Sequence, residues 1–143
     1  MKTLQQVLDN KKIHDVISID PNRLVFDALV ALAEHKIGAI LVLDGEKLAG
    51  IFSERDYARE VILKGRSSQT TKISEVMTSV VLTATPRDTV DYAMSLLSEK
   101  RIRHLPVIDN GKVVGILSIG DLVKETIEYQ QYLIKQLEHY IQS

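Results

Sequence analysis

The stretch Ala39–Asp56, AILVLDGEKLAGIFSERD, returns at His104–Asp121 as HLPVIDNGKVVGILSIGD. In each copy two apolar runs flank an Asp-Gly or Asn-Gly pair, which is the strongest short-range signal of a β-hairpin. Each hairpin leads into a Ser-x-x-Asp motif, which is typical of the start of a helix. The sequence therefore predicts the same hairpin, followed by a helix, twice.

The repeat extends upstream of the hairpin. A shift of 65 positions aligns residues 16–56 with residues 81–121 without a gap and gives 14 identities over 41 positions. Chance alone gives about two or three. The pattern in each copy is a short β-prone run closed by a proline, an amphipathic helix, the hairpin and a second helix. Each copy is thus predicted to form a β-α-β-β-α unit.

The expected boundaries follow from these patterns. The β-prone runs are residues 16–19 and 81–84, the amphipathic helices residues 24–36 and 89–101, and the helices after the hairpins residues 54–64 and 119–128. Short lead-in helices are expected at 3–8 and 72–77. The predicted domains are 1–64 for the first unit with its lead-in helix, 65–71 for a polar linker, 72–128 for the second unit and 129–143 for the extension of a long C-terminal helix.

The fold class is α/β (α+β). One unit has too few residues to cover both faces of a three-stranded sheet. We therefore expect the two units to pack sheet to sheet about a pseudo-twofold axis and to share one core.

Composition limits the function classes. The 143-residue chain has a formal net charge of −1 and no cysteine, so it has no basic field for nucleic acid, no disulfide and no thiolate metal site. Its first residues lack the signal-peptide pattern, and no run of about 18 apolar residues could span a bilayer. We therefore expect a soluble cytoplasmic protein without a nucleic-acid or membrane partner.

The Ser-x-x-Asp motifs, Ser53 to Asp56 and Ser118 to Asp121, have two interpretations. In the first, the serine and the aspartate only cap a helix. In the second, the helix N-terminus and the serine hydroxyl bind a phosphate, and the carboxylate accepts hydrogen bonds from a ribose diol. The sequence alone leaves both open.

With these two motifs and Arg103–Asp109 (RHLPVID) before the second hairpin, the chain resembles a pair of CBS domains, also called a Bateman module. The resemblance covers essentially the whole chain. It implies a regulatory, energy-sensing module in signal transduction that binds AMP, ADP, ATP or NAD(H), with S-adenosylmethionine also known in the family, in the cleft between the repeats. It further implies a homodimer that acts in trans on an effector protein of unknown identity, without a catalytic cofactor.

The resemblance also implies roles for individual residues. Asp56 and Asp121 would bind the ribose of two related sites. The phosphate contacts would come from Ser53, Arg55, Ser118, Arg101, Arg103 and His104. The adenine would lie against Val16, Ile17, Ile37, Ala39, Val81, Leu82, Ile102 and Pro106.

The two copies differ in their cations. Arg101, Arg103 and His104 of the second copy replace Lys36, Gly38 and Ala39 of the first, whereas Arg55 of the first copy is Gly120 in the second. We therefore expect two unequal sites, with the stronger phosphate contacts near Arg103, His104 and Asp121. The alternatives are a solvated helix end for Arg101 and Arg103 and a structural role for His104.

Two other functions compete with ligand sensing. An enzyme acting on a nucleotide is disfavoured because the sequence has no nucleophile with a base, no metal cluster and no P-loop. A purely structural dimerisation module with vestigial clefts is the second alternative. An apolar stripe on the C-terminal helix, formed by Val123, Ile127, Ile134, Leu137 and Ile141, indicates an interface.

Overall fold

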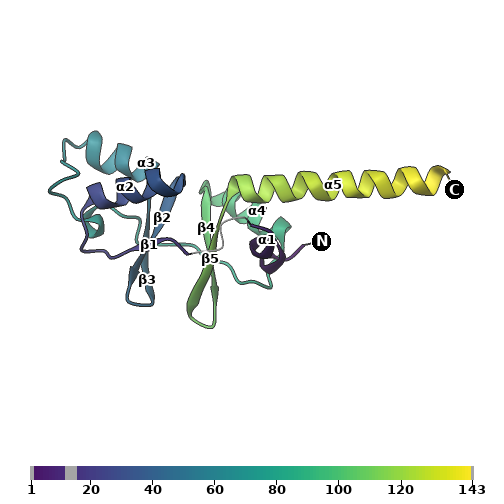
Figure 1. Cartoon of the computed structure of the whole chain (residues 1–143), viewed down its shortest axis with the longest axis horizontal. Helices are drawn as coiled ribbons and strands as arrows, with labels where there is room; N and C mark the ends of the chain where they lie inside the picture. The colour runs from purple at the N-terminus through teal and green to yellow at the C-terminus, as the bar shows by residue number, and fades with distance from the viewer. Residues whose placement is uncertain (1, 12–15, 143) are drawn as a thin grey trace. The chain divides into compact units, whose positions relative to one another are not determined.

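The computed structural model describes residues 2–11 and 16–142. It confirms the mixed α/β fold class, with two related units and a long C-terminal helix (Figure 1). In chain order the elements are α1 (Leu4–Asn10), β1 (Ser18–Ile19), α2 (Val25–His35), β2 (Ala39–Asp44), β3 (Lys47–Ser53), α3 (Glu54–Asp56), the π-helix η1 (Tyr57–Ile62), the 3-10 helix η2 (Ile73–Glu75), α4 (Val90–Lys100), β4 (His104–Asp109), β5 (Lys112–Ser118) and α5 (Ile119–Gln142).

The first repeat forms a three-stranded sheet in the order β1-β2-β3. β1 runs parallel to β2, with Ser18 opposite Leu41, and β2 runs antiparallel to β3, with Ala39 opposite Ser53. The starts of β1 and β2 and the end of β3 therefore lie at the same end of the sheet. This end is where the hairpin leads into α3.

The second repeat has the hairpin β4-β5 but not the strand predicted at 81–84. In its place Ala84 makes a single parallel bridge to Val107, through Ala84 N–H to the Pro106 carbonyl and Ile108 N–H to the Ala84 carbonyl. Extending this ladder toward Leu82 would require an N–H at residue 106, and proline has none. The corresponding residue of the first repeat is Leu41, and there the strand forms.

The helices after the hairpins also differ from the prediction. The helix expected at 54–64 is a single α-helical turn, α3, followed by the π-helix η1, in which Leu63 N–H reaches the Ala58 carbonyl at 3.0 Å. The helix expected at 119–128 and the predicted extension form one continuous helix, α5.

Each repeat has its own buried apolar cluster. In the first repeat the cluster consists of Val25, Ala28, Leu32, Ile40, Val42, Phe52, Val61, Ile73 and Val76. In the second it consists of Leu4, Val7, Ala84, Val90, Ala93, Leu97, Leu105, Val107, Leu117 and Leu122. The lead-in segments contribute to these clusters, α1 through Leu4 and Val7 and η2 through Ile73. Ala39 and Leu41, which alternate with the cluster residues of β2, are buried too, so β2 is covered on both faces.

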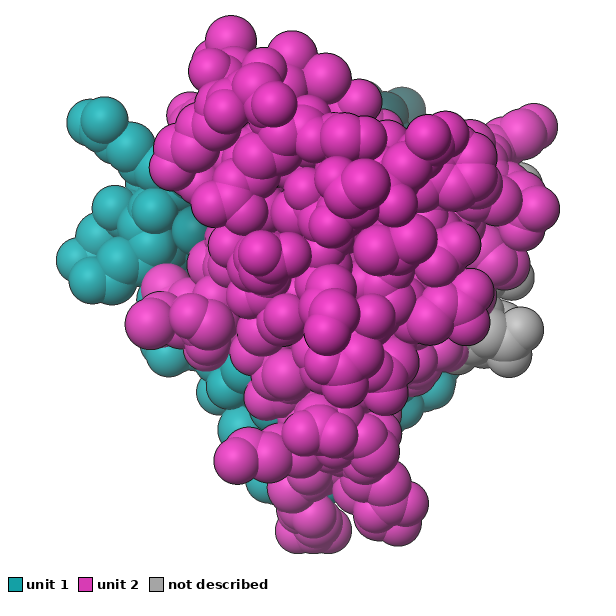
Figure 2. Space-filling model, turned by 90° about the vertical axis from the view of Figure 1, so that its left-hand side faces the viewer, with its two compact units in different colours: residues 1–14, 83–109, 114–143 teal, residues 15–82, 110–113 magenta. Residues whose placement is uncertain are grey.

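The lead-in segments are exchanged between the repeats. By contacts the chain divides into unit 1 (1–14, 83–109 and 114–143) and unit 2 (15–82 and 110–113), coloured separately in Figure 2. α1, which the sequence-based boundaries assign to the first repeat, thus packs with the second repeat, and η2 packs with the first.

Two glycines accommodate this exchange. A Cβ on Gly115 would lie 2.6 Å from Leu8 Cδ2, and a Cβ on Gly50 would lie 2.7 Å from both Met77 Sδ and the Thr78 carbonyl oxygen. The glycine repeated near the end of each hairpin is therefore required because a lead-in segment lies directly against it.

None of the helices in the described ranges combines the length and the apolar character needed to cross a membrane.

Candidate functional site

Both Ser-x-x-Asp motifs form the predicted capping boxes. In the first, Ser53–Asp56, the Ser53 N–H and hydroxyl donate to Asp56 Oδ2 at 2.9 and 3.0 Å, and the Asp56 N–H donates to Ser53 Oγ at 3.1 Å. The other carboxylate oxygen, Asp56 Oδ1, accepts from the Thr78 hydroxyl at 3.1 Å. The capping interpretation is therefore confirmed, and the ribose and phosphate roles stay predictions.

The second capping box, Ser118–Asp121, repeats this geometry with a different neighbour. Ser118 N–H donates to Asp121 Oδ2 at 2.8 Å, and Asp121 N–H donates to Ser118 Oγ at 3.1 Å. Here a lysine replaces the threonine: Lys11 Nζ lies 2.9 Å from Asp121 Oδ2 and also donates to the Ile116 carbonyl at 2.8 Å. The surroundings of the two capping boxes therefore differ, with Thr78 beside Asp56 and Lys11 beside Asp121.

Each helix start is joined to the entrance of its hairpin. Glu54 N–H donates to the Gly38 carbonyl at 3.1 Å, and Ile119 N–H donates to the Arg103 carbonyl at 2.9 Å. The N–H of the capping aspartate donates to the serine hydroxyl. The N–H of the residue just before that aspartate, Arg55 or Gly120, therefore donates neither to the capping serine nor to the hairpin carbonyl. That N–H can face an anion at the helix N-terminus.

The residues predicted to contact adenine lie at the ends of several elements, and their role stays a prediction. Val16 and Ile17 precede β1, Ile37 precedes β2 and Ala39 lies opposite Ser53, so the four lie at one end of the first sheet. Ile102 and Pro106 flank the start of β4, while Val81 and Leu82 belong to unit 2. Ala39 and Pro106 are buried and the other six are half-buried.

The predicted phosphate-binding arginines are exposed. Arg55 lies in the first turn after β3, Arg101 ends α4 in the left-handed conformation with φ 54°, and Arg103 immediately precedes β4. Within residues 2–11 and 16–142, no ion pair involves any of these three side chains. His104 begins β4 and is half-buried.

The electrostatic state of Asp121 is set by its burial and by three groups around it. Burial raises the pKa of its carboxyl, but the Ser118 N–H, the Lys11 ammonium and the Ser118 hydroxyl together outweigh burial, so the pKa lies below its ordinary value. Asp121 is therefore ionised at neutral pH and accepts hydrogen bonds without donating any.

Among the described residues, no group of three or more His, Cys, Asp or Glu side chains is arranged to hold a metal ion. The polar groups at each capping box are a carboxylate, hydroxyls and one backbone N–H, and the predicted site also includes arginines. These groups suit a ligand that has both hydroxyls and an anionic group.

The two halves of the chain match one family model. Residues 11–63 and 73–128 each match the CBS domain. The chain belongs to the CBS-domain family. CBS pairs are regulatory modules, and the two matches cover both capping boxes and both hairpins.

Known proteins similar to this CBS pair agree with the assignment. A mitochondrial CBS domain-containing protein of Arabidopsis thaliana, CBSX3, is 40% identical over 123 residues, which are 82% of this chain and 60% of the relative, so this chain spans less than two thirds of that protein. A solved structure of a protein with CBS domains from Burkholderia ambifaria has a TM-score of 0.86 and 46% identity, covering 89% of this chain and 95% of that one.

A third similar structure contains adenosine compounds. The CBS domain pair of protein MJ0100 has a TM-score of 0.78 and 26% identity, covering 90% of this chain and 98% of that one. It was solved in complex with 5′-methylthioadenosine and S-adenosylmethionine.

Lys11 and Thr78, the two side chains that bind the capping aspartates, were missed by the sequence interpretation. Lys11 follows the first lead-in helix and Thr78 follows the second, η2. The signal for them was the similarity of the two lead-in segments, combined with the repeated glycines, Gly50 and Gly115, against which those segments pack.

Removing the Lys11 charge is expected to make this CBS pair more sensitive to acid. Because the pKa of Asp121 is lowered in the folded state, its ionised carboxylate stabilises the fold above the ordinary value of 3.8, and this stability is lost as the pH falls through the folded-state pKa. In Lys11→Met the lysine no longer opposes the effect of burial on the Asp121 carboxyl. The pKa of Asp121 therefore rises, and acid unfolding begins at a higher pH.

An NMR titration of the Asp121 carboxyl carbon and an acid melt followed by circular dichroism measure both effects. Lys2→Met is the matched control, because Lys2 lies 2.8 Å from a different carboxylate, that of Glu125. An unchanged pKa of Asp121 in Lys11→Met would show that the lysine has no influence on the carboxylate.

Proposed function

We propose that this CBS pair is a regulatory, ligand-sensing module that binds an adenine nucleotide, AMP, ADP, ATP or NAD(H), at its two Ser-x-x-Asp capping boxes. The main support is that each capping box places an aspartate carboxylate at a helix start, beside one backbone N–H that does not donate to the cap. The adenosine compounds bound by the CBS domain pair of protein MJ0100 favour the same ligand class.

Each part of the nucleotide has a matching group. The ionised carboxylate of Asp121 would accept hydrogen bonds from the hydroxyls of the ribose, as a sugar diol requires, and Asp56 has the corresponding position in the first repeat. The phosphate would contact the N–H of Arg55 or Gly120, the serine hydroxyls and the exposed arginines. A charge-assisted hydrogen bond of this kind contributes about 1.5–3 kcal/mol.

The predicted regulation depends on how the ligand changes the module. A nucleotide that prefers one arrangement of the chain shifts the population toward it, typically by about 1–3 kcal/mol of coupling free energy. The shifted arrangement would be recognised in trans by an effector protein. In this proposal the module is a cytoplasmic homodimer without catalytic activity of its own. The cleft between the repeats stays a prediction, as does the role of each residue assigned to it.

A thermal-shift panel of AMP, ADP, ATP, NAD⁺, NADH and S-adenosylmethionine tests the proposal. A ligand at 100 times its Kd adds about 2.7 kcal/mol, which raises the Tm of a domain of this size by roughly 5–10 °C. GMP is the control for the base. If none of the six raises the Tm, the purely structural function is favoured instead. Chromatography of the nucleotide after incubation shows whether it is turned over, and turnover would make the protein an enzyme.

A further inference from the structure

The second half of α5 is exposed in the part of the chain that the structure describes. Every residue from 130 to 142 is exposed, and in the whole helix only Leu122 and Glu125 are buried. The exposed fractions of Ile134, Leu137 and Ile141 are 53%, 61% and 80%. Figure 1 shows α5 running on beyond α1 and α4 to the C-terminus. A single exposed helix of this length is only marginally stable in water, so its apolar stripe needs a partner.

The stripe has the heptad spacing of a two-stranded coiled coil. Ile127, Ile134 and Ile141 follow one another at intervals of seven and occupy position a. Val123 and Leu137, with Gln130 between them, occupy position d. Apolar residues at positions a and d form the seam along which two helices pack in a coiled coil. The occupant that this pattern fits is a helix of the same kind, and a second α5 provides one.

The charges beside the stripe distinguish the two orientations. Lys124 and Glu138 both occupy position e, and within the described residues neither takes part in an ion pair. In a parallel pair, position e faces position g of the other helix, which places Lys124 against Ile119 and Glu138 against Leu133. In an antiparallel pair, position e faces position e, which places Lys124 of each copy against Glu138 of the other.

The same antiparallel register pairs the apolar layers. Ile127 meets Leu137 of the second copy, Ile141 meets Val123, and Ile134 meets Gln130. The two copies of Leu133 face each other near the centre. The contact extends over 123–141, a helix length of about 28 Å.

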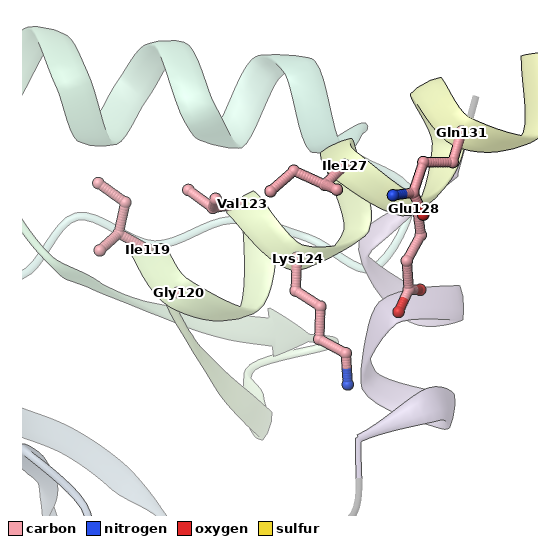
Figure 3. Close-up of a pocket in the computed structure, with 7 residues that line it drawn as sticks. All are labelled: Ile119, Gly120, Val123, Lys124, Ile127, Glu128 and Gln131. Atoms are coloured by element: carbon pink, nitrogen blue, oxygen red, sulfur yellow. The ribbon is translucent and has the colours of Figure 1, made fainter. Parts of the chain in front are cut away.

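A hollow at the start of the stripe also favours the antiparallel orientation. It has a volume of about 630 Å³ and is lined by Ile119, Gly120, Val123, Lys124, Ile127, Glu128 and Gln131. Figure 3 shows Ile119, Val123 and Ile127 in a row along α5, with Lys124 and Glu128 beside them. Antiparallel pairing brings Leu137 and Ile141 of the second copy to this hollow. Parallel pairing would place two identical hollows against each other and leave both unfilled.

The charge of α5 argues against a lipid surface as the occupant. Helices that lie on anionic membranes are rich in lysine and arginine on their polar face. In α5 four carboxylates outnumber two lysines: Asp121, Glu125, Glu128 and Glu138 against Lys124 and Lys135.

We propose that two copies of the chain associate through an antiparallel coiled coil of their α5 helices, with Lys124 of each copy paired to Glu138 of the other. This goes beyond the proposed function in naming the surface, its register and its orientation, and it does not require a nucleotide. The test is therefore made on nucleotide-free protein, where a failure leaves nucleotide binding untouched.

Sedimentation equilibrium measures the association. The wild type is expected to be a dimer at micromolar concentration, and Leu137→Asp is expected to raise the dimer Kd by more than about 100-fold. Lys124→Glu and Glu138→Lys should each raise it by about tenfold, and the double variant should return it to near the wild-type value. A monomeric wild type, or a dimer that Leu137→Asp leaves unchanged, would overturn the proposal.

Disulfide trapping measures the orientation, and it is direct because the chain has no cysteine. Oxidation of Ile127→Cys mixed with Leu137→Cys should give the mixed disulfide, since these positions share a layer in the antiparallel register. Ile134→Cys alone should remain uncrosslinked. Efficient crosslinking of Ile134→Cys to itself would show a parallel pair and overturn the orientation.

Discussion

Replacing Gly50 with alanine is expected to lower the free energy of unfolding by about 2–3 kcal/mol. The new Cβ would lie 2.7 Å from the Thr78 carbonyl oxygen and 2.7 Å from Met77 Sδ. The carbonyl is held in place, because Thr78 and Ile51 exchange two backbone hydrogen bonds of 2.9 Å. Relief of the clash therefore requires the lead-in segment to shift from the hairpin.

Gly115→Ala is the matched control for this prediction. Its Cβ would meet only the side chain of Leu8, with Leu8 Cδ2 at 2.6 Å. A leucine side chain can rotate away where a bonded carbonyl cannot, so the loss of stability at Gly115 should be the smaller of the two. Urea unfolding of both variants provides the comparison. A larger loss at Gly115 than at Gly50 would show that the Thr78 carbonyl is not the rigid obstacle.

Replacing Asp121 with alanine is expected to weaken nucleotide binding by about 100-fold or more and to remove the ligand-induced rise in Tm. The proposed ribose contact consists of two hydrogen bonds to a charged acceptor, and each such bond contributes about 1.5–3 kcal/mol. Isothermal titration calorimetry with the most stabilising nucleotide of the thermal-shift panel measures the loss. Binding of wild-type strength in Asp121→Ala would leave Asp121 as a helix cap only.

Asp88→Ala separates a lost ligand contact from a lost cap. Asp88 Oδ2 accepts from the Thr85 N–H at 2.8 Å, the same local bond that Asp121 makes with the Ser118 N–H at 2.8 Å, but Asp88 belongs to neither predicted site. Both variants lose a carboxylate that caps backbone, at a cost of about 1 kcal/mol in stability. Only Asp121→Ala should lose the nucleotide. An equal loss of nucleotide binding in Asp88→Ala and Asp121→Ala would show that binding is lost because the fold is destabilised.

The local elements could be predicted from the sequence because their signals are local. The first amphipathic helix was expected at 24–36 and is observed at Val25–His35, and both hairpins form around the expected turns. The capping boxes were also expected, since a serine and an aspartate three residues apart at a helix start are sufficient to form one. The repeat then led to the family, because it requires two such units in one chain.

The departures have causes outside any single segment. The missing strand at 81–84 results from Pro106, a residue of its partner strand, because Pro106 has no N–H to extend the ladder. The π-helix η1 gives no distinct pattern, because the spacing of Tyr57 and Val61 fits either kind of helical turn. The exchanged lead-in segments depend on contacts such as that between Leu8 and Gly115, which are distant in sequence.

The candidate site could be located from the sequence but not interpreted. Ser53, Asp56, Ser118 and Asp121 satisfy one another within each motif, so the same residues and the same geometry serve a cap and a nucleotide site alike. Lys11 was not expected because it reaches Asp121 from a different part of the chain. Ligand binding is therefore the property that separates the two interpretations.

The most direct test removes the ribose diol from the ligand and the carboxylate from the protein. Calorimetry compares AMP with 2′,3′-dideoxyadenosine monophosphate on the wild type and on Asp121→Ala. If Asp121 binds the diol, loss of the diol should weaken binding to the wild type by about 100-fold or more and to the variant by no more than about twofold. An equal loss in both proteins would contradict the assignment of Asp121 to the ribose.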